Sequence, residues 1–249
     1  MKLTEEQLLE NWQRLIAEIE ETQTGPRKNQ LIELYNKLQP EMLMAPASGF
    51  EHFHNCFIGG YVDHVVRVVQ CARKLYFTWK DMGLTADDFT HEELMFVAIN
   101  HDLGKIGDME NPLYVPNESE WHRKNQGKIY NYNSEIKTYM GVPDRSLWIL
   151  NQAGIQMTEQ EFLGIKIHDG LYEEGNGQYL KPYNKDRALS TALPLIVHQA
   201  DLMASRIEYE TWKSGPVVAI KETRKVKRQK QLSTANESAK DLFNDFFKE

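Results

Sequence analysis

The sequence predicts an all-α protein, and three features support that expectation. Apolar residues recur every three or four positions along several segments, as on one face of a helix. No segment shows the sustained alternation of apolar and polar residues that marks a half-buried strand. The chain has no internal repeat, so its 249 residues are expected to build one sizeable helical core with extensions.

The composition is that of an ordinary globular protein, with 41% hydrophobic and 26% charged residues. The net charge of −7 argues against a protein that coats nucleic acid or an anionic membrane over its whole surface, but leaves room for a local basic patch. Cys56 and Cys71 form no CxxC pair, so neither a disulfide framework nor a thiolate zinc site is expected. With no apolar export signal and no run of membrane-spanning length, a cytoplasmic location is predicted.

Residues 1–45 are expected to form an N-terminal helical extension. One helix covers about 4–22, where apolar residues lie at helical spacing and Thr4, followed by two glutamates, resembles an N-terminal cap. A second helix is expected over about 26–38. The segment 40–50 is expected to be a loop.

Residues 46–212 are expected to form the main domain, which opens with two apolar helices. The first covers about 60–79, with valines at helical spacing, and the second covers about 90–101, where glycines then interrupt the pattern. Residues 108–133 are polar and aromatic. A loop of that length in a compact helical domain is usually functional or disordered.

The second half of this domain carries three further helices. They are expected over about 144–152, 158–168 and 187–212, with an irregular, glycine-containing stretch at 169–186. Pro194 should kink the last helix or mark a restart.

Residues 213–249 change in composition and are expected to be an appendage. The run 221–230 is strongly basic, which is more often a solvated face than a nucleic-acid site. An amphipathic helix is expected over 236–249, with an apolar face formed by Leu242, Phe243, Phe246 and Phe247. Such tails resemble the sliding-clamp-binding tails of phage replication and transcription proteins, which implies a protein partner; packing on the chain's own domain is the alternative.

Six histidine and aspartate side chains lie on or at the ends of the predicted helices. Imidazole and carboxylate together suit Mn, Fe, Zn, Ni or Mg rather than a soft ion. Side chains on facing helices of a bundle can converge on such an ion, and two of these six are three residues apart on one helix. The six are His64, His101, Asp102, His168, His198 and Asp201.

The order of these residues resembles the signature of the HD-domain metal-dependent phosphohydrolases. The matching pieces read GGYVDHVVRVV, INHDLGKIGD and LIVHQADLMASRIE, and the resemblance covers 46–210. The context PASGFEHFHNCFIGGYVDH and the pair His198/Asp201 look most like the HD domain of YhaM-type 3′-to-5′ exoribonucleases. Those proteins usually carry an OB-fold domain, and the segment before Pro46 has neither the length nor a strand pattern for one.

This resemblance implies an HD-domain helical bundle that binds one or two divalent ions. The expected ligands of the first ion are His64, His101, Asp102 and Asp201. Asp102 would bridge to a second ion, for which His168 and His198 are candidates. His168 is alternatively an imidazole favoured by a helix C-terminus, and His198 alternatively supports a ligand or packs.

The implied chemistry is hydrolysis by metal-activated water. A bound ion lowers the pKa of water from about 15.7 towards about 7 and stabilises charge on a phosphoryl group. Asp102 and Lys105 are the expected catalytic residues. Lys105, three residues after Asp102, is expected to contact phosphate, although an exposed helix-end lysine is the alternative. Arg67, one turn after His64, could face the phosphate or pair with Asp63.

Cationic and aromatic residues gather within the loop 108–133. His122, Arg123 and Lys124 are candidates for holding phosphate, and neighbouring aromatic rings could stack on a base. An ordinary surface loop pinned by its aromatics is the alternative. This loop and 169–186 are expected to wall the pocket.

Three functions follow as expectations. The first is hydrolysis of a phosphate ester in a nucleotide or nucleotide-like molecule. The second, a near variant of the first, is a 3′-end single-strand nuclease. The third is a non-catalytic HD-fold binding or scaffold module with a partner-docking C-terminal helix. The complete ligand set and Lys105 favour an enzyme.

Overall fold

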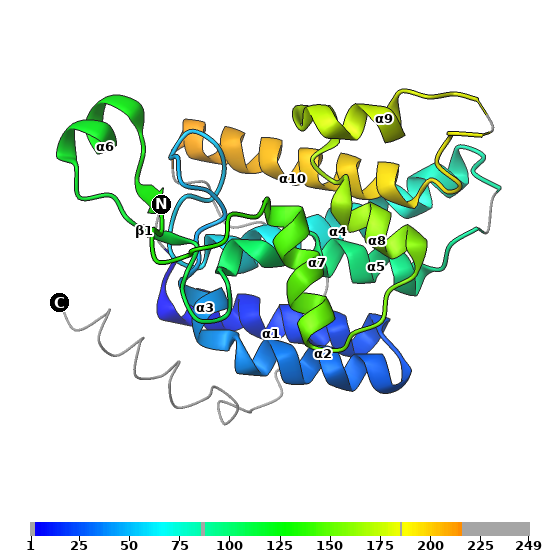
Figure 1. The fold of residues 1–249 in the computed structure, drawn as a ribbon, viewed down its shortest axis with the longest axis horizontal. Coiled ribbons are helices and arrows are strands. Elements are labelled where there is room, and N and C mark those ends of the chain that lie inside the picture. Colours follow the sequence, from blue (N-terminus) through cyan, green and yellow to red (C-terminus); the bar gives the residue numbers. More distant parts are fainter. Residues whose placement is uncertain (1–2, 86–87, 185, 216–249) are drawn as a thin grey trace.

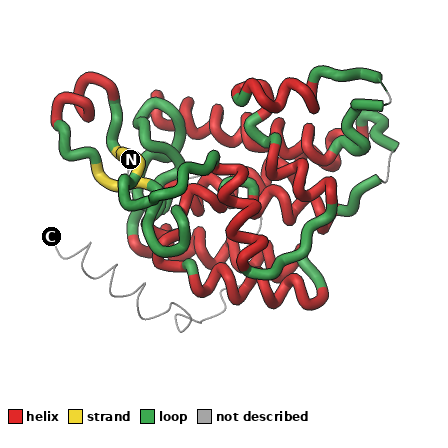
Figure 2. The backbone as a smooth tube through the Cα atoms, viewed as in Figure 1, coloured by secondary structure: helices red, strands yellow, loops and turns green. Residues whose placement is uncertain are grey.

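The computed structural model describes residues 3–85, 88–184 and 186–215. These residues form ten α-helices, short 3₁₀ turns and one sheet of two strands, so the all-α prediction is confirmed (Figure 2). The predicted basic run and C-terminal helix lie outside the described residues. None of the described helices is long and apolar enough to span a membrane.

The N-terminal helices are specified by local signals. In α1 (Glu5–Thr22), the predicted N-terminal cap at Thr4 is confirmed, and Thr4 and Gln7 together form a reciprocal capping box. α2 (Gly25–Lys37) follows with a proline in its first turn. The predicted loop at 40–50 is partly wrong, because α3 (Gln39–Met44) starts there: its proline also sits in the first turn, where no amide hydrogen is needed.

Two long helices form the centre of the molecule. α4 (Gly60–Asp81) and α10 (Leu193–Ser214) pack along each other (Figure 1). α5 (His91–Asn100) packs on α4 and is buried continuously from Leu94 to Asn100. A helix that is apolar on all sides belongs in the middle of a bundle, so the end of α5 is fixed inside the protein.

The remaining helices cover this centre. α7 (Val142–Gln152) packs on α8 (Glu159–Lys166), which in turn contacts α5 and α10. α1 packs against α4 and α5 from another side, and buried side chains of α1–α3 belong to the same apolar core as those of the later helices.

Three details differ from the predicted pattern. The stretch 108–133 contains a small antiparallel hairpin of β1 (Tyr114–Pro116) and β2 (Tyr130–Tyr132), with α6 (Glu120–Gln126) between the strands. The irregular stretch 169–186 includes 3₁₀ turns and the short α9 (Gly177–Leu180). α10 begins only at Leu193 with Pro194 in its first turn, so Pro194 marks the helix start rather than a kink.

Candidate metal centre

A buried cluster of histidine and aspartate side chains lies where four helices meet. His64 comes from the middle of α4, His101 and Asp102 from the end of α5, His168 from just after α8, and Asp201 from α10. The first four side chains are at most 3% exposed. Burial of so many ionisable groups is costly unless they are paired or bind a metal.

Asp102 occupies the middle of the cluster. Its Oδ2 lies 3.4 Å from Nε2 of both His64 and His101, and its Oδ1 lies 3.5 Å from Nε2 of His168. Asp201 approaches from α10, with Oδ1 3.1 Å from Nε2 of His64. Three imidazoles therefore present the same ring nitrogen to two carboxylates.

Two of these histidines share a backbone arrangement. Nδ1 of His101 lies 2.9 Å from the carbonyl of Ala98, and Nδ1 of His168 lies 2.8 Å from the carbonyl of Ile165, three residues earlier in each case. Carbonyls in the last turn of a helix lack intrahelical partners, so each imidazole satisfies one by donating its Nδ1–H. In the neutral ring this bond fixes the tautomer and leaves the lone pair on Nε2, as in most metal-binding histidines.

The Nε2 atoms themselves show what the cluster lacks. Nε2 of His64 and Nε2 of His101 are buried and have no hydrogen-bond partner among the described residues. Buried polar atoms are nearly always satisfied. A cation bound between these nitrogens and the carboxylates would satisfy both atoms, so the residues present fit a metal.

The donor atoms fall into overlapping groups, each with its atoms within 4.8 Å of one another. Three of these groups meet at the centre: His64/His101/Asp201, His101/Asp102/His168 and His168/Asp169/Asp201. The cluster could therefore hold a metal ion, and its nitrogen and oxygen donors suit a borderline or hard divalent cation.

Lys105 balances the central carboxylate. Its Nζ lies 2.6 Å from Oδ2 of Asp102, and its side chain is only 11% exposed. Burial by itself would raise the pKa of Asp102, but the charges of Lys105 and His101 hold that pKa well below its usual range. Burial by itself would lower the pKa of Lys105, but the charge of Asp102 raises that pKa. Lys105 and Asp102 therefore both stay charged.

The carboxylates act on the histidines in the same way. Burial favours a neutral imidazole, but Asp169 and Asp102 raise the pKa of His168 to about 9. Against the same cost of burial, Glu208, Asp102 and Asp201 raise the pKa of His64 well above its usual value. Before a cation binds, the imidazole of His168 is therefore protonated on both nitrogens at neutral pH, and the carboxylates around His64 favour the same form of its ring.

We expect cation affinity to rise steeply with pH below about 9. A cation must displace the proton of His168 below its pKa of about 9, so each proton released should make the apparent affinity about tenfold stronger per pH unit. Competition with a chelator between pH 6 and 8 would measure the cation affinity. The protons released on binding would be measured in two buffers of different ionisation enthalpy. An affinity independent of pH would contradict it.

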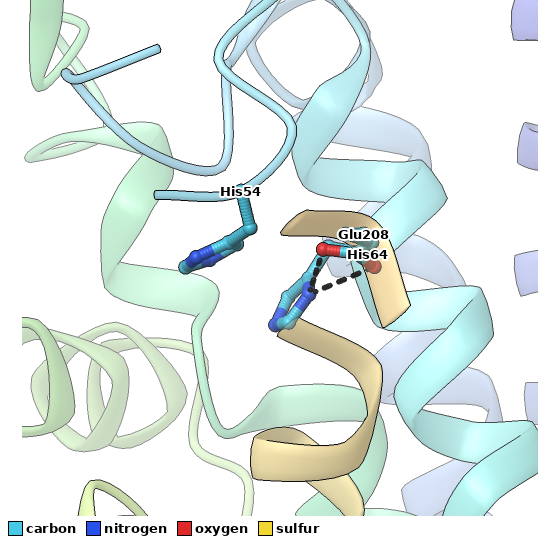
Figure 3. Close-up of side chains that lie close together, drawn as sticks. All are labelled: His54, His64 and Glu208. Atoms are coloured by element: carbon cyan, nitrogen blue, oxygen red, sulfur yellow. Dashed lines mark hydrogen bonds and ion pairs between the residues drawn. The ribbon is translucent and has the colours of Figure 1, made fainter. Parts of the chain in front are cut away.

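The sequence does not single out two residues of the centre, Glu208 and His54. Glu208 places Oε2 3.0 Å from Nδ1 of His64, and it lies seven residues after Asp201, two turns along one face of α10. The ring of His54 lies beside that of His64 and is tilted relative to it, with ring centroids 4.7 Å apart (Figure 3). Nε2 of His54 lies 3.4 Å from Nζ of Lys105. Helical spacing could have revealed Glu208, but His54 precedes the helix and has no such signal.

His198 and Arg67 lie just outside the cluster. Nδ1 of His198 is 2.8 Å from the carbonyl oxygen of His168, and none of the described donor groups includes His198. Nε of Arg67 is 3.1 Å from Oε1 of Glu208, and its guanidinium reaches Oδ2 of Asp63 at 3.9 Å.

The predicted phosphate contacts of α6 lie on a projecting hairpin (Figure 1). Arg123 donates to the carbonyl of Asn117 at 2.6 Å, and Lys124 pairs with Glu120 at 2.5 Å. His122 lies edge-on to Trp121. These contacts are local, and none of them reaches the metal cluster.

Comparison with known proteins found no matching family model, no matching curated protein and no matching solved structure.

Proposed function

We propose that this chain is a metal-dependent phosphohydrolase of the HD type, acting on a phosphate ester in a nucleotide or nucleotide-like molecule. One observation carries the proposal. Three buried imidazoles present Nε2 to the carboxylates of Asp102 and Asp201, and two of those nitrogens lack any hydrogen-bond partner among the described residues.

The residues divide into ligands and a charge partner. His64, His101, Asp102 and Asp201 would hold one ion, and His168 with Asp102 a second. A divalent ion bound there would supply a low-pKa water and stabilise a phosphoryl oxygen. The fixed Nδ1–H bonds of His101 and His168 keep their rings aimed at the ion without further reorganisation.

Lys105 is the residue proposed to bind the phosphate. Its ammonium lies between Asp102 Oδ2 and His54 Nε2, at 2.6 and 3.4 Å, beside the ligands rather than among them. Burial together with the charges of Lys105 and His64 keeps the pKa of His54 well below its usual value, so His54 is neutral and can accept a hydrogen bond from the ammonium. Cation binding to Asp102 would leave Lys105 free to hold a phosphate oxygen as a point charge.

A 3′-end nuclease is the variant that a second observation favours. The hairpin that carries α6 exposes Trp121 (60%) and Tyr132 (67%). Exposed rings of this kind are suited to stacking on successive bases of a single strand.

The proposal is tested by turnover of metal-loaded protein. Chelator-stripped protein would be reloaded with Mn²⁺ and given an aryl phosphate monoester, an aryl phosphodiester, a nucleotide panel and a 5′-labelled single-stranded oligonucleotide. We expect hydrolysis of at least one of these, a clear loss of rate in Lys105→Met, and retained Mn²⁺ binding in that variant. Full Mn²⁺ occupancy without hydrolysis of any substrate would overturn the enzyme and favour the scaffold alternative.

A further inference from the structure

We infer that Glu208 is a positioning residue that sets the strength of His64 as a metal ligand. The inference rests on the metal binding in the proposed function, but not on the reaction or its substrate. It comes from the side of His64 that faces away from the metal cluster.

Glu208 engages the one nitrogen of His64 that the metal would not use. Its Oε2 and Oε1 lie 3.0 and 3.3 Å from Nδ1, and both contacts are drawn in Figure 3. The residue is 3% exposed, so no bulk water competes for the ring proton. A carboxylate that accepts the Nδ1–H fixes the tautomer and makes the opposite nitrogen a more basic ligand.

The contact between Glu208 and Nδ1 of His64 also explains why Glu208 orients a ligand of the cluster and does not form a separate cation site. The donor atoms of His54, His64 and Glu208 do lie close together. A cation there would need Nδ1 of His64, while its Nε2 already faces Asp102 and Asp201 at 3.4 and 3.1 Å. One neutral imidazole has one lone pair, so it serves one metal position.

His64 differs in this respect from the other two histidines. His101 and His168 donate to the backbone carbonyls of Ala98 and Ile165, which no side-chain substitution removes. Only His64 is supported by a side chain that carries charge. Its strength as a ligand can therefore be changed at a single position without changing the ligand.

A chain of charged and amide side chains holds Glu208 in place. Nε of Arg67 lies 3.1 Å from Oε1 of Glu208, and the same guanidinium lies 3.9 Å from Asp63. Asp63 in turn accepts hydrogen bonds from Asn11 of α1 at 3.0 Å and from Asn55 at 2.8 Å. The carboxylate beside His64 is thereby tied to α4, α1 and the loop that carries His54.

The test compares Glu208→Gln, Glu208→Leu and the control Glu210→Gln, an exposed acid on the same helix. The probe is Mn²⁺ alone, with affinity measured by chelator competition and folding by thermal unfolding of the metal-free protein. We expect about tenfold weaker binding in Glu208→Gln, which keeps an accepting oxygen, and up to about 100-fold in Glu208→Leu. The control should bind as the wild type does.

The possible outcomes separate this inference from the proposed reaction. A folded Glu208→Gln with wild-type Mn²⁺ affinity, together with an equally unaffected Glu208→Leu, would overturn the inference. Graded loss of affinity in a protein that hydrolyses no phosphate ester would support the inference and overturn the reaction. A wild type that fails to bind Mn²⁺ would overturn both.

Discussion

Replacing Asp102 by alanine is expected to abolish cation binding and, with it, phosphate ester hydrolysis. The two oxygens of this carboxylate lie within 3.5 Å of the Nε2 atoms of three histidines. Because the carboxylate could bridge two metal ions, its removal would take one donor atom from each of them. Residues that only orient a ligand cost about 10–100-fold when lost, so a shared ligand should cost more than about 100-fold. Metal content after gel filtration and initial rates with Mn²⁺ would measure both losses.

The control must separate a lost ligand from a lost fold. Asp102→Ala leaves Lys105 without its partner in a site where the lysine is only 11% exposed, so Asp102→Asn, which keeps the shape, should be measured beside it. Glu33→Gln, an exposed acid on α2, serves as the matched neutral change. Full activity in either Asp102 variant with native-like unfolding would contradict the assigned role of this carboxylate.

Much of the helical framework could be predicted from the sequence because its signals are local. The spacing of apolar residues and the Thr4 cap predict α1, and the valine spacing predicts α4. The two strands could not be predicted, because a three-residue strand contains too few residues to show an alternating pattern. The short α3 is not predicted from the sequence, because the proline at its start and its small length are both typical of a loop.

The metal cluster was predictable in part, for a physical reason. The adjacent pair His101-Asp102 stands out because a polar dipeptide follows a helix whose second half is apolar from Leu94 to Ile99. Spacing along a helix shows which residues share a face, but not what that face meets. His198 shares a face of α10 with Asp201, yet its Nδ1 faces the carbonyl of His168. Glu208 meets His64 from 144 residues away, a pairing that only the folded chain reveals.

The two helix ends at the cluster connect fold and site. His101 caps the end of α5 and His168 lies just after α8, and Nδ1 of each bonds a carbonyl three residues back, in the last turn of the helix. The bond that satisfies a carbonyl at each helix end is therefore also the bond that orients a ligand. A site made this way depends on the position of the helices, so the packing that holds α5 and α8 together should matter for both stability and metal binding.

Arg27→Met is expected to cause the largest loss of stability among the changes outside the cluster. The guanidinium of Arg27, on α2, lies 2.6 Å from Glu161 on α8 and 2.9 Å from Glu92 on α5, and 4.6 Å above the ring of Phe96. The Glu161 side chain is fully buried. Removing one partner of a buried ion pair leaves an uncompensated charge, which costs about 3 kcal/mol at the lower end of the usual range.

Thermal unfolding would show this loss as a fall in Tm, at roughly 2–4 °C per kcal/mol for a chain of this size. Lys37→Met, an exposed lysine at the other end of α2, is the control and should leave Tm almost unchanged. Arg27→Lys should recover only part of the loss, because an ammonium cannot bridge two carboxylates as the planar guanidinium does. An Arg27→Met variant that unfolds within about 1 °C of the wild type would contradict this prediction. The contact between α2 and the helices near His101 and His168 would then contribute little to the stability of the fold. In that case α1–α3 would behave as an extension rather than as part of the support for the metal centre.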